Sequence, residues 1–420
     1  MRARRGASVV AGAEPIEVAR GLQAAAPTLN RAPLAAAMLS LAYAATLFQR
    51  LAFQGVGPLI GDELHLSGDV LADVAASFFW AYLILMIPGG ILVDACGPRR
   101  VATLAACLSG TGCALFANAF RPDELIVARV LLSAGGALTF VAMMRFIVVA
   151  FHDRKSTVSG RAIFVGNIGA ISAGAPLAVL LSLVVWRDVW ELLAIGWLLL
   201  GAAIWLSMPQ EASPQRSHSS ALRMLRETGR ILRSGHTWLA ILVLAGLAGS
   251  YWAFANLIAV RVLSVSRLSS IESGLAISTL VCGYALGALV WGRAGDRFRR
   301  EHLIVLACML ACAAWLAMTW IGALTLLVAE LVFFLAGFGA GAFGLVYSVM
   351  TDRFPAFQGG TVIAVINCGI PLGAAILQSV AGRLPGNAAM LPVVVGATLA
   401  VFGALVLQAV AMRNAASEPY

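Results

Sequence analysis

The sequence predicts an all-α membrane protein whose twelve transmembrane helices form two pseudo-symmetric six-helix bundles. The 420-residue chain is 60% hydrophobic and only 12% charged, with a mean hydropathy of +0.90. Soluble domains carry about 25% charged residues. Twelve apolar runs approach or exceed the roughly 20 residues that cross a bilayer as a helix. Features of the first half also recur about 200 residues later, as expected for an internal repeat.

Residues 1–33 are polar and alanine-rich, and the first apolar run starts too late for a cleaved signal peptide. We expect this segment to be a cytoplasmic tail. Residues 34–208 hold six apolar runs, predicted as the first bundle, and residues 237–412 hold six more, predicted as the second. The runs lie at 34–58, 70–92, 101–119, 124–150, 160–184, 190–208, 237–263, 271–293, 302–320, 323–350, 359–382 and 389–412. They lack the alternation of barrel strands, so helices are the structure that satisfies their backbone in lipid.

Residues 209–236 form the long polar segment between the halves. Arg223, Arg226, Arg230 and Arg233 recur at intervals of three, four and three, with leucine and isoleucine between them. This spacing predicts a basic amphipathic helix on the inner leaflet. A solvated linker whose charges only fix the topology is equally compatible with it. Residues 413–420 form a short C-terminal tail, also predicted to be cytoplasmic.

The arginines predict the orientation in the membrane. With the N-terminus inside, 21 of the 29 basic residues lie in inner segments and five in outer ones, which places both termini in the cytoplasm. The net charge of +9 therefore reflects membrane topology, and we expect no nucleic-acid partner. The seven cysteines show no pairing or metal-ligand spacing, so we expect neither a metal nor a cofactor. No catalytic constellation is found, so an enzyme is not expected.

A glycine–aspartate–arginine pattern ends the second run and returns in the eighth. Gly90 lies one helical turn before Asp94, so a neighbouring helix can approach at the glycine and face the carboxylate. A carboxylate at the end of an apolar segment is costly and suggests a function. The candidate gating residues from the two copies are Gly90, Asp94, Gly97, Arg99, Arg100, Gly292, Asp296 and Arg297.

These residues resemble the loop signature of the major facilitator superfamily, which lies between spans two and three. The second copy is degenerate, because Arg299 stands where a glycine is expected. Arg129 with Ser133, Gly135 and Gly136 is similar to the span-four motif of the family. Stretches in spans one, two, five and eleven resemble the bacterial branch of sugar-phosphate and organic-anion permeases. The resemblance covers residues 34–412 and specifies the fold far better than the substrate.

The resemblance implies two bundles that rock about a shared seam, with a solute site between them near mid-membrane. It also implies that Asp94 closes the inner side by accepting hydrogen bonds from the start of span eleven, around Gly359 and Gly360, where the helix dipole favours an anion. Asp296 is expected to do the same against the start of span five near Gly160. The alternative is that Asp94 only fixes the loop topology.

Three charged residues lie within the predicted spans and are candidates for solute binding. Arg50 lies in span one, where the resembling branch uses an arginine for the anionic group of the solute. Snorkelling to the outer surface is the alternative. Arg129 and Glu330 occupy matching positions in spans four and ten. They either pair across the pseudo-twofold axis, which would make Glu330 a candidate for proton coupling, or act independently.

Further polar and aromatic residues are candidates for the wall of the site, although such residues also serve as packing contacts between helices. They are Tyr43, Gln54, Tyr82, Trp252, Asn256, Tyr284, Asn367 and Gln378.

The resulting prediction is a monomeric secondary transporter of the bacterial cytoplasmic (inner) membrane that moves a small polar, anionic organic solute by symport or anion exchange. A coupling proton and the lipid bilayer are the other expected partners. A proton-driven exporter of amphipathic compounds and a membrane sensor that has lost transport are the alternatives, because the fold alone does not decide function.

Overall fold

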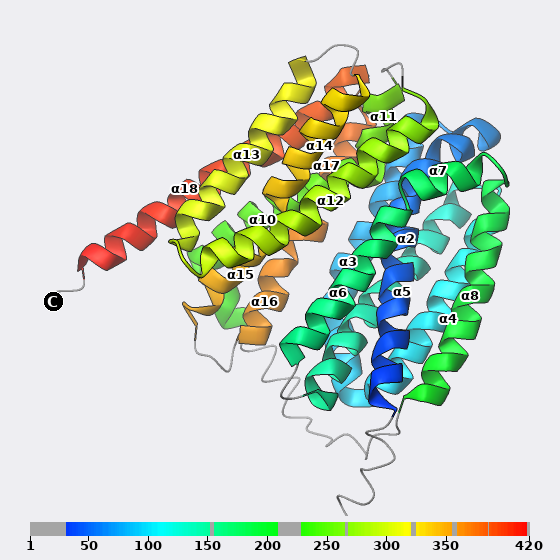
Figure 1. Ribbon diagram of the computed structural model, residues 1–420, viewed down its shortest axis with the longest axis horizontal. Helices are drawn as coiled ribbons and strands as arrows, with labels where there is room; N and C mark the ends of the chain where they lie inside the picture. Colours follow the sequence, from blue (N-terminus) through cyan, green and yellow to red (C-terminus); the bar gives the residue numbers. More distant parts are fainter. Residues whose placement is uncertain are drawn as a thin grey trace, which may run out of the picture.

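The computed structural model describes residues 31–151, 155–208, 228–264, 268–320, 325–354, 359–384 and 386–417, which form a helical molecule (Figure 1). Seven helices come from the first half of the chain. They are α2 (Ala32–Leu64), α3 (Gly68–Cys96), α4 (Pro98–Ala117), α5 (Pro122–Ala150), α6 (Lys155–Ser172), α7 (Ala175–Leu181) and α8 (Trp186–Ser207).

The second half supplies a matching set that packs beside the first (Figure 1). It consists of α10 (Gly235–Ala253), η2 (Phe254–Ile258), α11 (Ala259–Ser264), α12 (Ser270–Gly295), α13 (Arg300–Trp320), α14 (Leu326–Ala340), α15 (Phe343–Thr351), α16 (Gly359–Asn367), α17 (Gly369–Gly382), η4 (Gly386–Met390) and α18 (Leu391–Ser417).

The described residues contain eleven helices long and apolar enough to cross a membrane, and twelve if the bent pair α6–α7 counts as one span. The predicted all-helical, polytopic fold is therefore confirmed. The helices extend past several predicted runs, and α2 continues to Leu64 instead of ending near residue 58. The predicted basic helix of the linker falls mainly on residues 209–227, outside the described ranges. Of its arginines, Arg230 and Arg233 are described and exposed.

Several spans that the sequence predicts as continuous are interrupted. Span five bends by 42° between α6 and α7, where Pro176 and Gly174 weaken the helix. Span seven contains the π-helix η2, a feature often found at functional sites. Span ten breaks between α14 and α15, and span eleven breaks at Cys368 between α16 and α17. The hydropathy pattern does not show these breaks because the residues around them are as apolar as the rest.

Glycines let helices of one bundle pack with their backbones in contact. A Cβ atom at Gly169 would lie 2.1 Å from the carbonyl oxygen of Ala44, so α6 lies directly on α2. In the second bundle, a Cβ atom at Gly337 would lie 2.1 Å from the carbonyl oxygen of Leu280, which brings α14 onto α12. Such close packing supplies the van der Waals contacts that hold helices together where lipid removes the hydrophobic drive.

The seam between the bundles has two different ends. We call the end that carries Arg99, Arg100 and the α12–α13 turn the arginine-rich face, and the end that carries α7 and α11 the opposite face. Contacts across the seam join α3 to α17, α2 to η2, and α12 to both α6 and α7. The two groups of ribbons diverge toward α15 and α16 (Figure 1).

The opposite face is where the bundles touch most tightly. The hydroxyl of Ser278 on α12 accepts a hydrogen bond from the backbone N–H of Ala175 (3.1 Å) and donates to the carbonyl of Ile171 (3.3 Å). A Cβ atom at Gly382 would lie 1.9 Å from the Cβ of Ala72. An ion pair of 3.1 Å between Arg383 and Asp73 lies beside this contact. The structure is therefore a conformation closed at the opposite face.

Candidate functional site

Arg50 lies in the middle of α2, at the seam, among aromatic rings from both bundles. Its guanidinium carbon lies 5.1 Å from the ring centre of Phe78, 4.7 Å from Tyr82 and 4.9 Å from Trp252. The residue is 8% exposed, and its Nε has no hydrogen-bond partner among the described residues. Snorkelling to the outer surface, the alternative at the sequence level, is therefore wrong. The faces of these rings stabilise a cation, but they leave its N–H donors available for an anion.

Arg129 on α5 contacts the ring of the same phenylalanine and is fully buried. Its guanidinium carbon lies 4.8 Å from the centre of the Phe78 ring and 4.5 Å from that of Phe53. One Nη donates to the backbone carbonyl of Ala75 (3.2 Å). The Nε and the second Nη have no partner among the described residues. Arg129 is thus a buried cation with unused donors.

Asn256 is the contact of the second bundle with this arginine. In the amide orientation that satisfies both of its ends, its Oδ1 accepts from an Nη of Arg129 (3.2 Å) and from Nε2 of Gln378 (3.2 Å), and its Nδ2 donates to the backbone carbonyl of Arg50. Asn256 projects from the π-helix η2, and Gln378 from α17. Both are fully buried. The two predicted residues therefore meet across the seam and tie the second bundle to both arginines.

A wall of phenols lies near Arg50. The ring of Trp252, which contacts Arg50, lies 5.2 Å from the ring of Tyr251 and 6.2 Å from that of Tyr284. Tyr284 stacks on Tyr251 with ring centres 4.3 Å apart and on Phe343 at 5.3 Å. Phenol hydroxyls donate and accept hydrogen bonds, so this wall suits a solute that carries hydroxyl groups besides its charge.

Asn367 ends α16 and is half-buried, on the side of the seam toward the arginine-rich face. Its Oδ1 accepts a short hydrogen bond from the hydroxyl of Tyr347, and its Nδ2 lies 3.7 Å from the sulfur of Met86 on α3. Asn367 thus reaches the first bundle, but no contact with Arg50 or Arg129 is found among the described residues.

Among the residues that the structure describes, no carboxylate forms an ion pair with Arg50 or Arg129. The suggested pairing of Arg129 with Glu330 is not found: Glu330 on α14 is half-buried and bonded to neither arginine. Matching positions in a repeat do not bring two side chains together when each helix packs inside its own bundle. The cluster therefore carries uncompensated positive charge.

Gln54 lies outside this cluster. It follows Arg50 by one turn of α2 and lines a cavity of about 390 Å³ on the opposite-face side of the seam, together with Gly174, Ser182, Ser273 and Gly274. Its Oε1 is buried and has no partner among the described residues. The cavity is lined by both bundles, so it lies on the route that would open if the bundles separated at this face.

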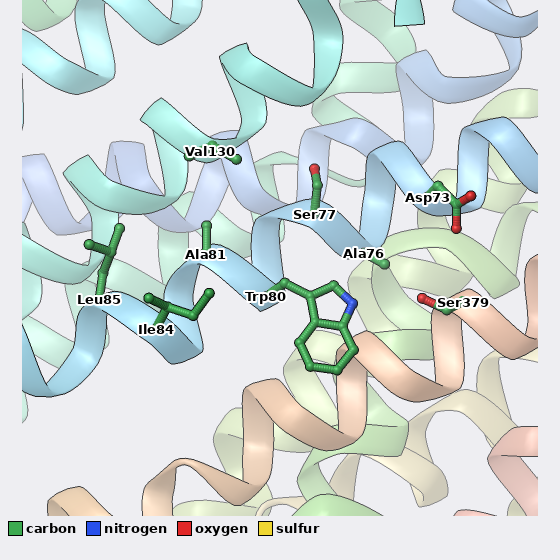
Figure 2. Close-up of a pocket in the computed structure, with 9 residues that line it drawn as sticks. All are labelled: Asp73, Ala76, Ser77, Trp80, Ala81, Ile84, Leu85, Val130 and Ser379. Atoms are coloured by element: carbon green, nitrogen blue, oxygen red, sulfur yellow. The ribbon is translucent and has the colours of Figure 1, made fainter. Parts of the chain in front are cut away.

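A second cavity, of about 480 Å³, lies between α3, α5 and α17 (Figure 2). Figure 2 shows Ser77, Ala81 and Leu85 on the side of α3 that faces Val130, and Trp80 on the side that faces Ser379, with Ser379 across from Asp73. Trp80 and Ile84 are exposed, and neither arginine lines this space. This cavity is a groove on the surface of the molecule, and it is separate from the two arginines and the residues that contact them.

The structure describes the candidate gating residues unevenly. The carboxylate of Asp94 and the surroundings of Gly359, Gly360 and Gly160 lie outside the described side chains. Asp296 ends α12 and is exposed. Added Cβ atoms at Gly90 and Gly292 would meet nothing within 4 Å, so the close helix approach predicted at these glycines is absent in this conformation, whose seam is closed at the other end.

Arg99 takes a role that the sequence does not indicate. Its Nε donates to the backbone carbonyl of Trp205 (3.0 Å), and its guanidinium carbon lies 4.1 Å from the centre of the Trp205 ring. It thereby holds the start of α4 against the end of α8. The other arginine of the pair, Arg100, is exposed, as is Arg297 in the second copy, and Gly97 forms the turn between α3 and α4 with a positive φ of 81°.

The sequence analysis did not single out four aromatic residues at the seam, namely Phe53, Phe78, Tyr251 and Tyr347. Phe78 lies one helical turn before Tyr82, on the same face of α3, and this spacing was a usable signal. Tyr251 lies next to Trp252 and offered a weaker one. No pattern in the sequence singles out Phe53 or Tyr347.

Two helical bundles with a charged cluster at their seam define a membrane carrier. The chain belongs to the Major Facilitator Superfamily, whose family model matches residues 39–378. The resemblance seen in the motifs is therefore confirmed, and the protein is a multi-pass membrane transporter and not an enzyme.

Among curated relatives, the chain is 25% identical to the probable galactarate/D-glucarate transporter GarP of Escherichia coli over 345 residues, which cover 71% of this chain and 76% of that protein. It is 24% identical to the probable sulfoacetate transporter SauU of Cupriavidus necator over 180 residues, 42% of each chain.

Solved structures show the same fold. The nucleoside transporter NupG, as its D323A mutant, matches with a TM-score of 0.74 and 12% identity, covering 89% of this chain and 99% of that one. A bacterial homologue of the human lysosomal transporter Spinster, in an inward-facing and occupied conformation, matches with a TM-score of 0.69 and 15% identity, covering 88% and 94%.

Proposed function

We propose that the protein moves a small organic anion across the bacterial inner membrane by alternating access. The observation that carries the proposal is the pair of buried arginines, for which no carboxylate partner is found among the described residues. An unpaired charge in the membrane core is costly and marks a solute pathway. A solute that brings its own negative charge is therefore favoured.

Two further observations narrow the solute class. The tyrosines near Arg50 suit a hydroxylated compound, and the names of the curated relatives described above refer to organic anions: galactarate, D-glucarate and sulfoacetate. We infer symport or exchange of such an anion by a monomeric carrier. For the alternative of an exporter of amphipathic compounds, the two arginines disfavour a cationic cargo, because like charges repel.

By the distribution of arginines, the arginine-rich face is cytoplasmic and so are both termini. The structure then corresponds to a state open to the cytoplasm. This assignment is tested by labelling single cysteines placed at exposed positions of each face in intact cells with an impermeant maleimide. Labelling of residues on the α12–α13 turn from outside would reverse the assignment.

The substrate proposal is tested with purified protein in proteoliposomes loaded with unlabelled anion, measuring uptake of labelled galactarate, D-glucarate or sulfoacetate. We expect uptake by the native chain and a loss of tenfold to a hundredfold or more in Arg50→Ala, since a charge-assisted hydrogen bond contributes about 1.5–3 kcal/mol. Arg50→Lys should retain part of the activity, because lysine keeps the charge but not the bidentate geometry.

Arg121→Ala is the matched control, since Arg121 is exposed on the opposite face and pairs only with the nearby Asp123. Normal flux in Arg50→Ala would refute the anion assignment. Binding of an anion without flux in any variant or in the native chain would favour the sensor alternative.

A further inference from the structure

In this conformation the side chain of Arg129 is not accessible to solvent, although it lies at the seam between the bundles. It is fully buried, whereas Tyr43, Tyr82, Tyr347 and Asn367, on the side of Arg50, are half-buried. Arg129 lies two turns from the start of α5, the end that belongs to the opposite face. Arg50 lies near the middle of α2. The two guanidiniums therefore stand at different depths along the solute pathway, and both contact the ring of Phe78.

Arg129 has contacts in both bundles, and only those with the second bundle are lost if the bundles separate. Ala75, Phe53 and Phe78 belong to the first bundle and move with Arg129. Asn256 belongs to the second bundle, and Gln378 of the same bundle holds its amide oxygen in place. If the bundles separate at the opposite face, Asn256 and Gln378 leave with α17 and η2. Arg129 then keeps its hydrogen bond to the backbone carbonyl of Ala75, and the other N–H donors of its guanidinium become accessible.

Arg129 keeps donor groups that an anion could use. Two of them, its Nε and one Nη, have no partner among the described residues. Buried hydrogen-bond donors without acceptors are costly. We therefore expect such unpaired donors at a position where a bound anion accepts their hydrogen bonds during the transport cycle.

We propose that Arg129 is the anion-binding residue of the conformation open at the opposite face, and that Asn256, supported by Gln378, takes the place of the anion while that face is closed. The two arginines then bind the solute in turn: Arg129 from the opposite face and Arg50 from the arginine-rich face. Asn256 is a positioning residue that acts through Arg129. This inference rests on the proposed transport of an organic anion.

The first experiment measures the half-saturating concentration separately at each face. It uses exchange of labelled galactarate, D-glucarate or sulfoacetate in proteoliposomes in which one orientation has been inactivated. We expect Arg129→Gln to raise the half-saturating concentration at least tenfold at the opposite face and less than twofold at the arginine-rich face. Arg50→Gln should raise it at the arginine-rich face, which provides the matched control.

The second experiment changes Asn256 instead and covers the case in which Arg129→Gln does not fold. Asn256→Asp is isosteric and gives Arg129 a permanent counter-ion, so it should slow exchange at least tenfold, with the half-saturating concentration at the arginine-rich face unchanged. Asn256→Gln keeps the amide and should restore part of the rate. If Asn256 had only a structural role, Asn256→Asp and Asn256→Gln should change the exchange rate to a similar extent.

Several outcomes would overturn the inference. One is an equal effect of Arg129→Gln at both faces, and another is no effect at either. A third is native exchange in Asn256→Asp. By contrast, absence of transport of all three anions by the native chain would overturn the proposed function itself, so the two failures are distinguishable.

Discussion

At the scale of single residues, the protein keeps two cations in its membrane core with aromatic rings and amides in place of acids. Rings stabilise a guanidinium without consuming its donors, whereas a carboxylate would neutralise it and compete with an anionic solute. Phe78 serves both arginines at once, at 5.1 Å and 4.8 Å. One aromatic ring therefore contributes to the stabilisation of both cations.

Glu330 provides a test at this scale, because it is the one carboxylate well inside a predicted span. Since Glu330 is bonded to neither arginine, we expect Glu330→Gln to retain anion exchange within about twofold of the native rate. The measurement is counterflow of labelled anion without a proton gradient, with Arg50→Ala as the inactive control. Loss of exchange in Glu330→Gln would show that this carboxylate acts in the solute step after all.

The sequence identified the charged residues of the cluster because a charge inside an apolar run stands out. It also identified Asn256 and Gln378 as candidates by their polarity. It did not show that these two residues seal Arg129, because that contact joins positions more than 100 residues apart and depends on how the bundles meet. Nor did it separate Gln54 from Arg50, which are one helical turn apart but face different spaces.

At the scale of elements, the interrupted helices concentrate near the seam. The bend between α6 and α7 presents Gly174 and Ala175 to α12, and η2 presents Asn256 to the first bundle. Small residues make these contacts, as at Gly382 against Ala72. The sequence predicted the spans from length and hydropathy alone. It did not predict their breaks, since helix interruptions depend on tertiary contacts that replace the lost backbone hydrogen bonds.

Gly382→Val should prevent the opposite face from closing. The added Cβ would lie 1.9 Å from that of Ala72, and overpacking costs about 1–3 kcal/mol. We expect a several-fold or greater shift toward the conformation open at this face. The measurement uses a cysteine that replaces Gln54. Its rate of labelling by an impermeant maleimide is compared between the chain that carries Gly382→Val and the chain with Gly382.

Gly196→Val is the matched control, since a Cβ atom at Gly196 would meet nothing within 4 Å. It should leave the labelling rate unchanged. If Gly382→Val labels no faster than Gly196→Val, the contact between α17 and α3 does not determine closure.

At the scale of the whole molecule, closure at one face requires separation at the other if the bundles move as rigid bodies. The open surroundings of Gly90 and Gly292 agree with an open arginine-rich face. The repeat in the sequence predicted the two bundles because each six-span unit has its own set of motifs. It did not predict which face is closed, since both conformations belong to the same sequence.

Asp94→Asn tests the closure of the arginine-rich face. The start of a helix stabilises an anion by about 0.3–1 kcal/mol, and by up to ~2 kcal/mol when partly buried. Losing the charge should therefore reduce flux by about twofold to thirtyfold while anion binding at this face persists. Asp296→Asn should have a smaller effect, because Asp296 is exposed and its motif is degenerate. Native flux in Asp94→Asn would remove Asp94 from the transport cycle.

The ion pair between Asp73 and Arg383 has a consequence for the setting in which the carrier works. Both side chains are about half-exposed, 46% and 56%, so dissolved ions reach them. At physiological ionic strength the Debye length is ~8 Å, and it shortens as salt is added. Added salt at the opposite face should thus weaken this ion pair and with it the contact that holds the bundles together there. The ionic strength at this face is therefore expected to shift the equilibrium between the two conformations of the carrier.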